Sequence, residues 1–176
     1  MNRAVFLDRD GVINEVLTKR VKFVNKPDDF HLLKGVALAI KQLNEAGLFV
    51  FVVTNQGGVG LGFLKEEMLL RIHDKMINDL EEKEAKIDDV AYCVHKPKAG
   101  CLCRKPGTQM IRDLAQKHHI DLKRSVMVGD REPDIEAGRA AGCKTILVGE
   151  RYQGDFGADA MVKSLQKAVP WILDQF

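Results

Sequence analysis

The pattern of apolar positions predicts that short buried strands alternate with amphipathic helices. Five apolar runs are typical of strands covered on both faces, namely 4–7, 48–53, 90–94, 125–128 and 145–148. Helical spacing of apolar residues predicts helices from Val36 to a stop at Gly47, over Lys65–Lys83, around Met110–Ala115, from Pro133 to Gly142 and over Ser164–Phe176. This alternation indicates an α/β fold with a parallel, doubly wound sheet, in which residues 1–176 form one domain.

Composition narrows the classes of protein that fit this pattern. The 176 residues are 45% hydrophobic and 30% charged, as in ordinary globular domains. The 27 basic and 25 acidic residues leave a net charge of +2, which gives no argument for a nucleic-acid or membrane partner. The longest apolar run, 48–53, is too short to span a bilayer, and the N-terminal residues do not form a signal peptide. We therefore expect a cytoplasmic monomer that acts on a small molecule.

Polar side chains follow four of the predicted strands at the points where those strands end. Ligands of such sheets bind at the carboxyl ends of the strands. These ends carry Asp8 and Asp10 after the first strand, Thr54, Asn55 and Gln56 after the second, Arg104 and Lys105 in the loop after the third, and Asp130 after the fourth, with Asp134 four residues on. An isolated Asp-x-Asp or Gly-Asp is weak evidence, but their joint placement favours a phosphate site.

Phosphoryl transfer is the chemistry that needs this combination of residues. Asp8 can attack phosphorus and form an acyl phosphate, and Asp10 can protonate the leaving alcohol and then deprotonate water. The adjacent carboxylates require a hard cation, so we expect Mg²⁺ held by Asp8 and Asp130. Thr54 and Asn55 can donate hydrogen bonds to the phosphoryl oxygens, and Lys105 supplies a fixed positive charge.

The segments FLDRDGVIN, VVTNQGG, CRKPG and VGDREPDIEAG resemble the four motifs of the haloacid-dehalogenase-like hydrolases. More narrowly, they are similar to the branch that holds heptose bisphosphate phosphatases and histidinol-phosphatases. The resemblance implies that Asp8 is the nucleophile, that Asp10 is the acid/base, and that the backbone carbonyl of Asp10 joins Asp8 and Asp130 around Mg²⁺. It also implies that Arg104 faces the substrate. No interval between the motifs is long enough for a cap domain, so we expect an open site.

Three of the four cysteines form a second constellation with a histidine. Cys93-x-His95 and Cys101-x-Cys103 supply the ligands of a tetrahedral structural Zn²⁺ site, which the family branch also carries. The loop ends at Arg104 and Lys105, so zinc is expected to position these two residues. The remaining thiol and imidazole side chains are interpreted as structural or solvated, and they are Cys143, His31, His73, His118 and His119.

The sequence motifs point to different substrates, because some resemble one branch of the family and some the other. The five-residue gap between His95 and Cys101, and Arg131 after Asp130, resemble the histidinol-phosphatases. RKPGTQM and DRDGVIN are closer to the heptose enzymes, although Leu61 stands where those enzymes commonly have an arginine. We expect a sugar phosphate or bisphosphate, such as D-glycero-D-manno-heptose 1,7-bisphosphate, with histidinol phosphate as the alternative. Gln56 and Arg131 are further candidates for substrate contact.

Two other classes of protein share parts of this pattern. A signalling receiver domain has acidic residues, a Thr and a Lys on a similar sheet, but its phosphoacceptor follows the third strand, where this chain has the cysteine loop. A zinc-containing nucleic-acid-binding module conflicts with the balanced charge and with the lack of an aromatic platform. Steady turnover of a phosphate ester distinguishes the phosphatase from both.

Overall fold

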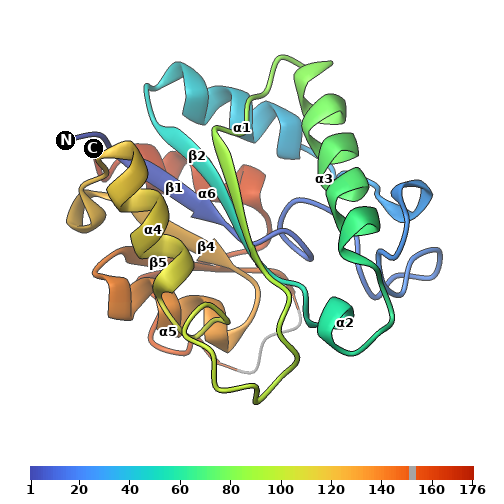
Figure 1. The fold of residues 1–176 in the computed structure, drawn as a ribbon. Helices are drawn as coiled ribbons and strands as arrows, with labels where there is room; N and C mark the ends of the chain where they lie inside the picture. The colour runs from blue at the N-terminus through green and yellow to red at the C-terminus, as the bar shows by residue number, and fades with distance from the viewer. Residues whose placement is uncertain (151–153) are drawn as a thin grey trace.

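A six-stranded parallel sheet forms the centre of the molecule in a computed structural model that describes residues 1–150 and 154–176 (Figure 1). The order of strands is β3-β2-β1-β4-β5-β6. Their bounds are β1 Ala4–Leu7, β2 Phe49–Asn55, β3 Asp89–Cys93, β4 Val126–Gly129, β5 Lys144–Val148 and β6 Ala160–Val162. This arrangement confirms the predicted parallel, doubly wound fold. In the part of the chain that the structure describes, no helix is both long and apolar enough to cross a membrane.

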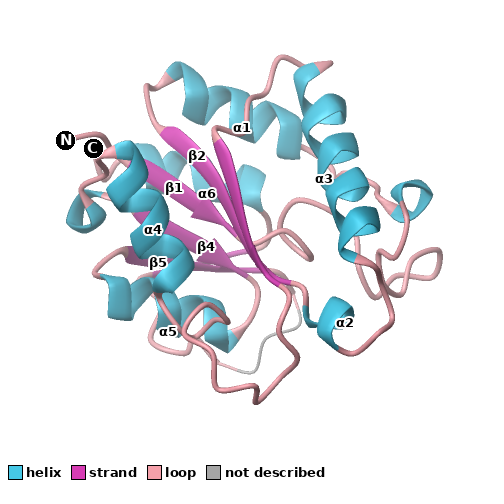
Figure 2. Cartoon of the chain, viewed as in Figure 1, coloured by secondary structure: helices cyan, strands magenta, loops and turns pink. Residues whose placement is uncertain are grey.

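Helices cover both faces of the sheet and bury two separate apolar clusters (Figure 2). One face packs against α1 (Val36–Glu45), α3 (Glu66–Glu81) and α6 (Leu165–Leu173), and the other against α4 (Gln109–His118) and α5 (Glu132–Ala141). The remaining helical segments are short: α2 (Gly57–Gly60) and the 3-10 turns η1 (Pro27–Asp29) and η2 (Leu122–Arg124). Because β1, β2 and β4 are buried on both faces, they read in sequence as continuous apolar runs.

The predicted strands and helices are confirmed, although their bounds shift by a few residues and the short segments α2, η1 and η2 were not predicted. Three differences need comment. β2 extends through Thr54 and Asn55, which were expected to follow it, because both residues pair with β3. β6 was not predicted, since its three residues are only partly buried and pair with β5 alone. Pro170 was expected near the start of the last helix but lies in the interior of α6.

The order in which strands are added to the sheet reverses between β1 and β4, while the strands themselves stay parallel. β2 and β3 lie on one side of β1, whereas β4, β5 and β6 lie on the other. In open α/β sheets, ligands bind at such a switch point, outside the carboxyl ends of the strands. Asp8 follows β1 and Asp130 follows β4, so both carboxylates lie at this position.

Candidate active site

Asp8 and Lys105 form a buried ion pair at the end of β1. Lys105 Nζ lies 2.9 Å from Asp8 Oδ1 and 2.6 Å from Asp134 Oδ1, and it also donates to the carbonyl of Val53 at 2.8 Å. All three N–H bonds of the ammonium are therefore in use. The positive charge of Lys105 is thus held directly beside an oxygen of Asp8.

Three carboxylates surround this single ammonium. Oxygens of Asp8, Asp130 and Asp134 lie within 4.8 Å of one another. Burial, together with repulsion from Asp134, raises the pKa of Asp8 to about 6, although Lys105 opposes the shift. Burial and the charge of Asp8 raise the pKa of Asp130 to about 8. Burial disfavours the charge of Lys105, but Asp134 and Asp8 outweigh it and hold its pKa above the usual value. The cluster thus has an excess of negative charge.

The carboxylate cluster also offers open coordination. Asp130 Oδ1 is buried and has no hydrogen-bond partner among the residues described. Both oxygens of Asp134 are already used, since Oδ1 pairs with Lys105 and Oδ2 accepts from the backbone amides of Asp130 and Arg131 at 3.2 Å each. Oxygen ligands with surplus negative charge suit a hard divalent cation. The atoms free to bind it belong to Asp8 and Asp130.

Two glycines allow this close packing of backbone and carboxylate. Gly11 has φ of +84°, and a Cβ there would lie 2.1 Å from Asp130 Oδ2. A Cβ on Gly129 would lie 2.1 Å from the Cβ of Asp134. Any larger residue at either position would displace a carboxylate of the site.

Asp10 is held by a network that differs from that of Asp8. Its Oδ1 accepts from Arg9 Nη2 at 2.8 Å, Arg9 Nε at 3.2 Å and Asn14 Nδ2 at 3.0 Å, and its Oδ2 accepts from Gln56 Nε2 at 3.1 Å. Burial alone would raise the pKa of Asp10, but the charge of Arg9 and these hydrogen bonds lower it overall. Asp10 is therefore a carboxylate in the free protein, with Oδ2 less occupied than Oδ1.

The three polar residues at the end of β2 are Thr54, Asn55 and Gln56, and their side chains bond to different parts of the site. Gln56 Nε2 also donates to Thr54 Oγ1 at 2.9 Å, which leaves the hydroxyl proton of Thr54 free. Asn55 was predicted to bind a phosphoryl oxygen, but its side chain contacts the backbone of Lys105. Its Nδ2 donates to the Lys105 carbonyl at 3.1 Å, and its Oδ1 accepts from the Lys105 amide at 2.9 Å. Asn55 thus anchors the lysine and keeps only one N–H for a ligand.

An open cleft of about 550 Å³ reaches Asp10 from solvent. Among its lining residues are two cations, Arg104 and Arg131, together with Gln56. Its rim carries three large apolar side chains that remain exposed, namely Phe23 at 57%, Leu61 at 50% and Phe63 at 74%. The cleft therefore combines sites for anions with apolar surface, as a phosphorylated compound with a carbon skeleton requires.

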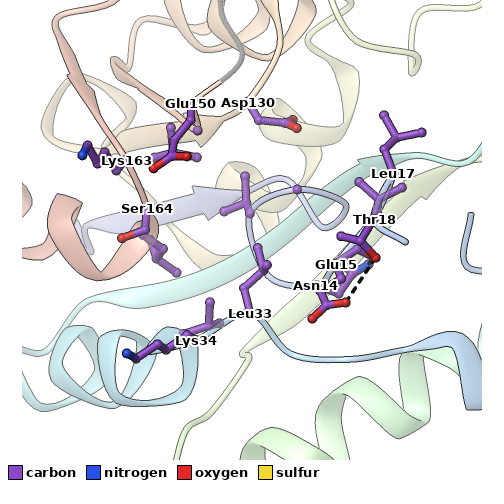
Figure 3. Close-up of a pocket in the computed structure, with 17 residues that line it drawn as sticks. Asn14, Glu15, Leu17, Thr18, Leu33, Lys34, Asp130, Glu150, Lys163 and Ser164 are labelled. Atoms are coloured by element: carbon purple, nitrogen blue, oxygen red, sulfur yellow. Dashed lines mark hydrogen bonds between the residues drawn. The ribbon is translucent and has the colours of Figure 1, made fainter. Parts of the chain in front are cut away.

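A second hollow of about 400 Å³ includes Asp130 in its lining (Figure 3). Figure 3 shows Asp130 and Glu150 at its top and Lys34 at its bottom. Asp10 lines the first cleft but not this hollow. Of these two spaces, the first cleft is therefore the one that gives access to Asp10.

The predicted zinc ligands converge beyond the end of β3. One atom from each of Cys93, His95, Cys101 and Cys103 lies within 4.8 Å of the others. Cys93 Sγ is 2.7 Å from Cys103 Sγ and 3.8 Å from Cys101 Sγ, and His95 Nδ1 is 3.2 Å from Cys103 Sγ. Burial raises the pKa of the Cys93 thiol to about 12, so a cation is needed to deprotonate it at neutral pH. Three thiols and an imidazole are a donor set suited to Zn²⁺.

Two features of the site were not predicted from the sequence. Asp134 was located near Asp130 but was given no role, whereas it is the second carboxylate partner of Lys105. Its position four residues after Asp130, in the first turn of α5, is the signal that could have identified it. The buried contact of Arg9 with His73 had no signal, because 64 positions separate the two residues.

Comparisons with known proteins agree with this geometry. A family model described as "HAD-hyrolase-like" matches residues 102–168. The chain is 39% identical over 169 residues to a D-glycero-beta-D-manno-heptose-1,7-bisphosphate 7-phosphatase of Rhodopseudomonas palustris, with 92% of this chain and 89% of the relative covered. It is 37% identical over 147 residues to a D-glycero-alpha-D-manno-heptose-1,7-bisphosphate 7-phosphatase of Photorhabdus laumondii, covering 80% and 78%. A crystal structure of the D,D-heptose 1,7-bisphosphate phosphatase from B. bronchiseptica, complexed with magnesium and phosphate, superposes with a TM-score of 0.88 at 33% identity over the whole of both chains.

Proposed function

Because the chain belongs to the heptose-1,7-bisphosphate 7-phosphatase family of the HAD-like hydrolases, we propose that it removes the 7-phosphate of a D-glycero-D-manno-heptose 1,7-bisphosphate through a phosphorylated Asp8. The observation that carries the chemistry is the buried Asp8, with the ammonium of Lys105 at 2.9 Å and the carboxylate of Asp130 beside it. The substrate rests on the named relatives. Residues 1–176 act as one domain in this proposal.

Asp8 and Asp130, with the backbone carbonyl of Asp10, are the residues that would hold Mg²⁺. Support comes from the unpartnered Asp130 Oδ1, from the surplus of carboxylates and from the magnesium in the related B. bronchiseptica structure. When bound, the ion supplies positive charge that offsets repulsion between Asp8 and the phosphoryl oxygens. Asp134 is not assigned as a ligand, since both of its oxygens have partners within the protein.

The two half-reactions divide between Asp8 and Asp10. An oxygen of Asp8 forms a bond to phosphorus as the bond from phosphorus to the sugar oxygen breaks, and Asp10 Oδ2 gives that oxygen a proton. In the second half, Asp10 takes a proton from water, the water oxygen bonds to phosphorus, and inorganic phosphate leaves Asp8. A phosphate dianion beside Asp10 raises its pKa and so favours the protonated acid that the first half requires.

The remaining polar residues hold the substrate in this proposal. The free hydroxyl proton of Thr54 and the remaining N–H of Asn55 can donate to the phosphoryl oxygens. Arg104 and Arg131 line the cleft on the side of Asp10 and can bind the phosphate that stays on the sugar. Gln56 contributes through its bonds to Asp10 and Thr54.

Zn²⁺ on Cys93, His95, Cys101 and Cys103 has a structural role in this proposal. The loop it would close reaches the cleft, because Arg104 Nη1 donates to the carbonyl of His95 at 3.4 Å and Pro97 lines the same space. Four protein ligands leave no open position on a tetrahedral ion, so zinc does not take part in the reaction.

The test is a substrate panel with purified protein and Mg²⁺. Both anomers of the heptose 1,7-bisphosphate, a heptose 7-monophosphate and histidinol phosphate are compared by phosphate release, and the remaining phosphate is located by ³¹P NMR. We expect the bisphosphate to give the highest kcat/KM, with the 1-phosphate retained. Preference for histidinol phosphate would overturn the substrate, and turnover of none of these esters would overturn the proposed function.

A further inference from the structure

His73 is a buried imidazole that the proposed chemistry does not use. It lies on α3, far in sequence from the catalytic motifs, and its side chain is only 5% exposed. Its Nε2 lies 3.1 Å from Nη1 of Arg9, a residue that is itself 1% exposed. Burying a polar pair this deeply costs free energy of desolvation. A specific role would account for the presence of His73 and Arg9 between α3 and the end of β1.

The roles of the two groups in this contact follow from their chemistry. Arginine has five N–H donors and no acceptor, so His73 Nε2 must be the acceptor. The ring therefore carries its proton on Nδ1 and is neutral. Burial and the charge of Arg9 favour this form, since they lower the pKa of His73 to about 3.

The guanidinium of Arg9 connects His73 to the acid/base carboxylate. Its Nη2 and Nε both donate to Asp10 Oδ1, while Nη1 donates to His73. The planar guanidinium is thus held on two sides, and it cannot rotate without losing its hydrogen bonds to Asp10 or to His73. With the third bond from Asn14, Oδ1 is fully occupied, and only Oδ2 faces a single protein donor, Gln56.

We propose that His73 is a positioning residue for the acid/base step: by accepting from Arg9 it holds the guanidinium that fixes Asp10 with Oδ2 toward the leaving oxygen. This inference rests on the proposed function, in which Asp10 exchanges the proton. Without the acceptor, Arg9 keeps its charge beside Asp10 but has freedom to rotate. The Asp10 carboxylate then loses the orientation on which proton transfer depends.

The experiment compares leaving groups. The quantity kcat/KM reports on the steps up to release of the alcohol. A sugar phosphate needs a proton on its leaving oxygen, whereas p-nitrophenyl phosphate and acetyl phosphate do not. For His73→Leu we expect kcat/KM to fall by about tenfold to a hundredfold with the sugar phosphate and by less than about threefold with the activated esters. For the sugar phosphate, the fall should lie in kcat with KM nearly unchanged.

Matched variants separate positioning from simple loss of structure. In His73→Gln the side-chain oxygen can replace Nε2 as acceptor, so the rate with the sugar phosphate should recover. His73→Asn is too short to reach Arg9 and should behave like His73→Leu; it also carries the test if the leucine variant does not fold. His118→Gln serves as the control, because His118 is a partly buried histidine whose Nε2 contacts Asp89.

The outcomes distinguish this inference from the proposed function. An equal fall for both leaving-group classes, no fall in either, or a glutamine variant as impaired as the asparagine variant would overturn the role of His73. If the parent enzyme hydrolyses none of the esters, the proposed function fails before the variants are compared.

Discussion

The carboxylate cluster and the cysteine loop are both candidate metal sites, but they differ in how firmly the surrounding protein holds their side chains. Asp8, Lys105 and Asp134 are 8%, 3% and 3% exposed. Asp8 directly follows β1, Asp134 lies on α5, and Lys105 lies in the loop between β3 and α4. In the cysteine loop, by contrast, only Cys93 is fully buried, and Leu102 is 75% exposed. The core therefore holds the carboxylates in place by itself, whereas the loop has little apolar packing of its own and would depend on the proposed Zn²⁺ for its shape.

Lys105 belongs to both regions, and its contacts show which of them fixes the position of its side chain. By sequence it ends the cysteine loop, but its ammonium is paired with Asp8 and Asp134 and its backbone is bonded by Asn55. The side chain of Arg104, one residue earlier, makes only the 3.4 Å hydrogen bond to the carbonyl of His95 among the described residues. We infer that disturbing the loop releases Arg104 and leaves Lys105 in place. The following predictions test this difference, from the largest expected effect to the smallest.

Removing the proposed nucleophile, Asp8, should abolish activity and leave the core intact. In Asp8→Asn, an amide cannot attack phosphorus, so turnover should fall by at least about a thousandfold. Because the change removes one of three crowded carboxylates, the melting temperature of the metal-free protein should not fall. Steady-state kinetics and thermal unfolding measure the two effects, with Asp113→Asn on the exposed side of α4 as the control. Activity within tenfold of the parent would exclude Asp8 as the nucleophile.

Removing Mg²⁺ should stop turnover and reveal the charge imbalance of the cluster. Activity lost in EDTA should return with Mg²⁺ but poorly with Ca²⁺, which prefers longer bonds and looser geometry. Full activity in metal-free buffer would contradict a metal-dependent reaction.

The same cluster predicts a dependence of stability on pH. Without metal, the folded-state pKa values of Asp8 and Asp130 are raised to about 6 and about 8 from an ordinary value of 3.8. The folded state then binds more protons than the unfolded state between these limits, so the free energy of unfolding should decrease as pH rises from about 4 to 8. Mg²⁺ at a hundred times its Kd adds about 2.7 kcal/mol. The difference in melting temperature between the two conditions should widen with pH; a constant difference would contradict these shifts.

Breaking the cysteine loop should have a smaller and more local effect. We expect one Zn²⁺ per chain by elemental analysis, lost in Cys101→Ser while the protein stays folded. Release of Arg104 should raise KM about tenfold and change kcat little, since Lys105 is anchored elsewhere. Asn55→Ala, which removes that anchor, should instead lower kcat. A zinc content near zero in the parent, or unchanged kinetics in Cys101→Ser, would contradict a metal-fixed loop that contributes to the site.

The sequence was sufficient for the parts of the site that follow directly from strands. Asp8, Asp130 and Thr54 lie at strand ends that meet at one edge, so strand prediction alone brings them together. The cysteine cluster could also be predicted from the sequence, because two pairs of ligands, each two residues apart, need only a short loop between them to come together.

Contacts between distant elements were beyond this reasoning. The phosphoryl contact expected of Asn55 stays a prediction, but residue type does not indicate which other partners a side chain has, and nothing in the sequence pointed to its bonds with the backbone of Lys105. Likewise, His73 was interpreted as structural or solvated, since nothing in the spacing along α3 shows which residue of β1 or its exit it meets. Packing of a helix on a sheet decides such contacts, and a periodic pattern gives only the buried face.

The bonds between Asn55 and Lys105 have a consequence for how such enzymes can diverge. They fix Lys105 to β2 independently of the ten residues that precede it, from His95 to Arg104. Insertions, deletions and substitutions in that stretch can then alter which substrates are recognised while the bond-making apparatus stays unchanged. The anchor on Asn55 thus separates changes in substrate recognition from changes in the position of Lys105.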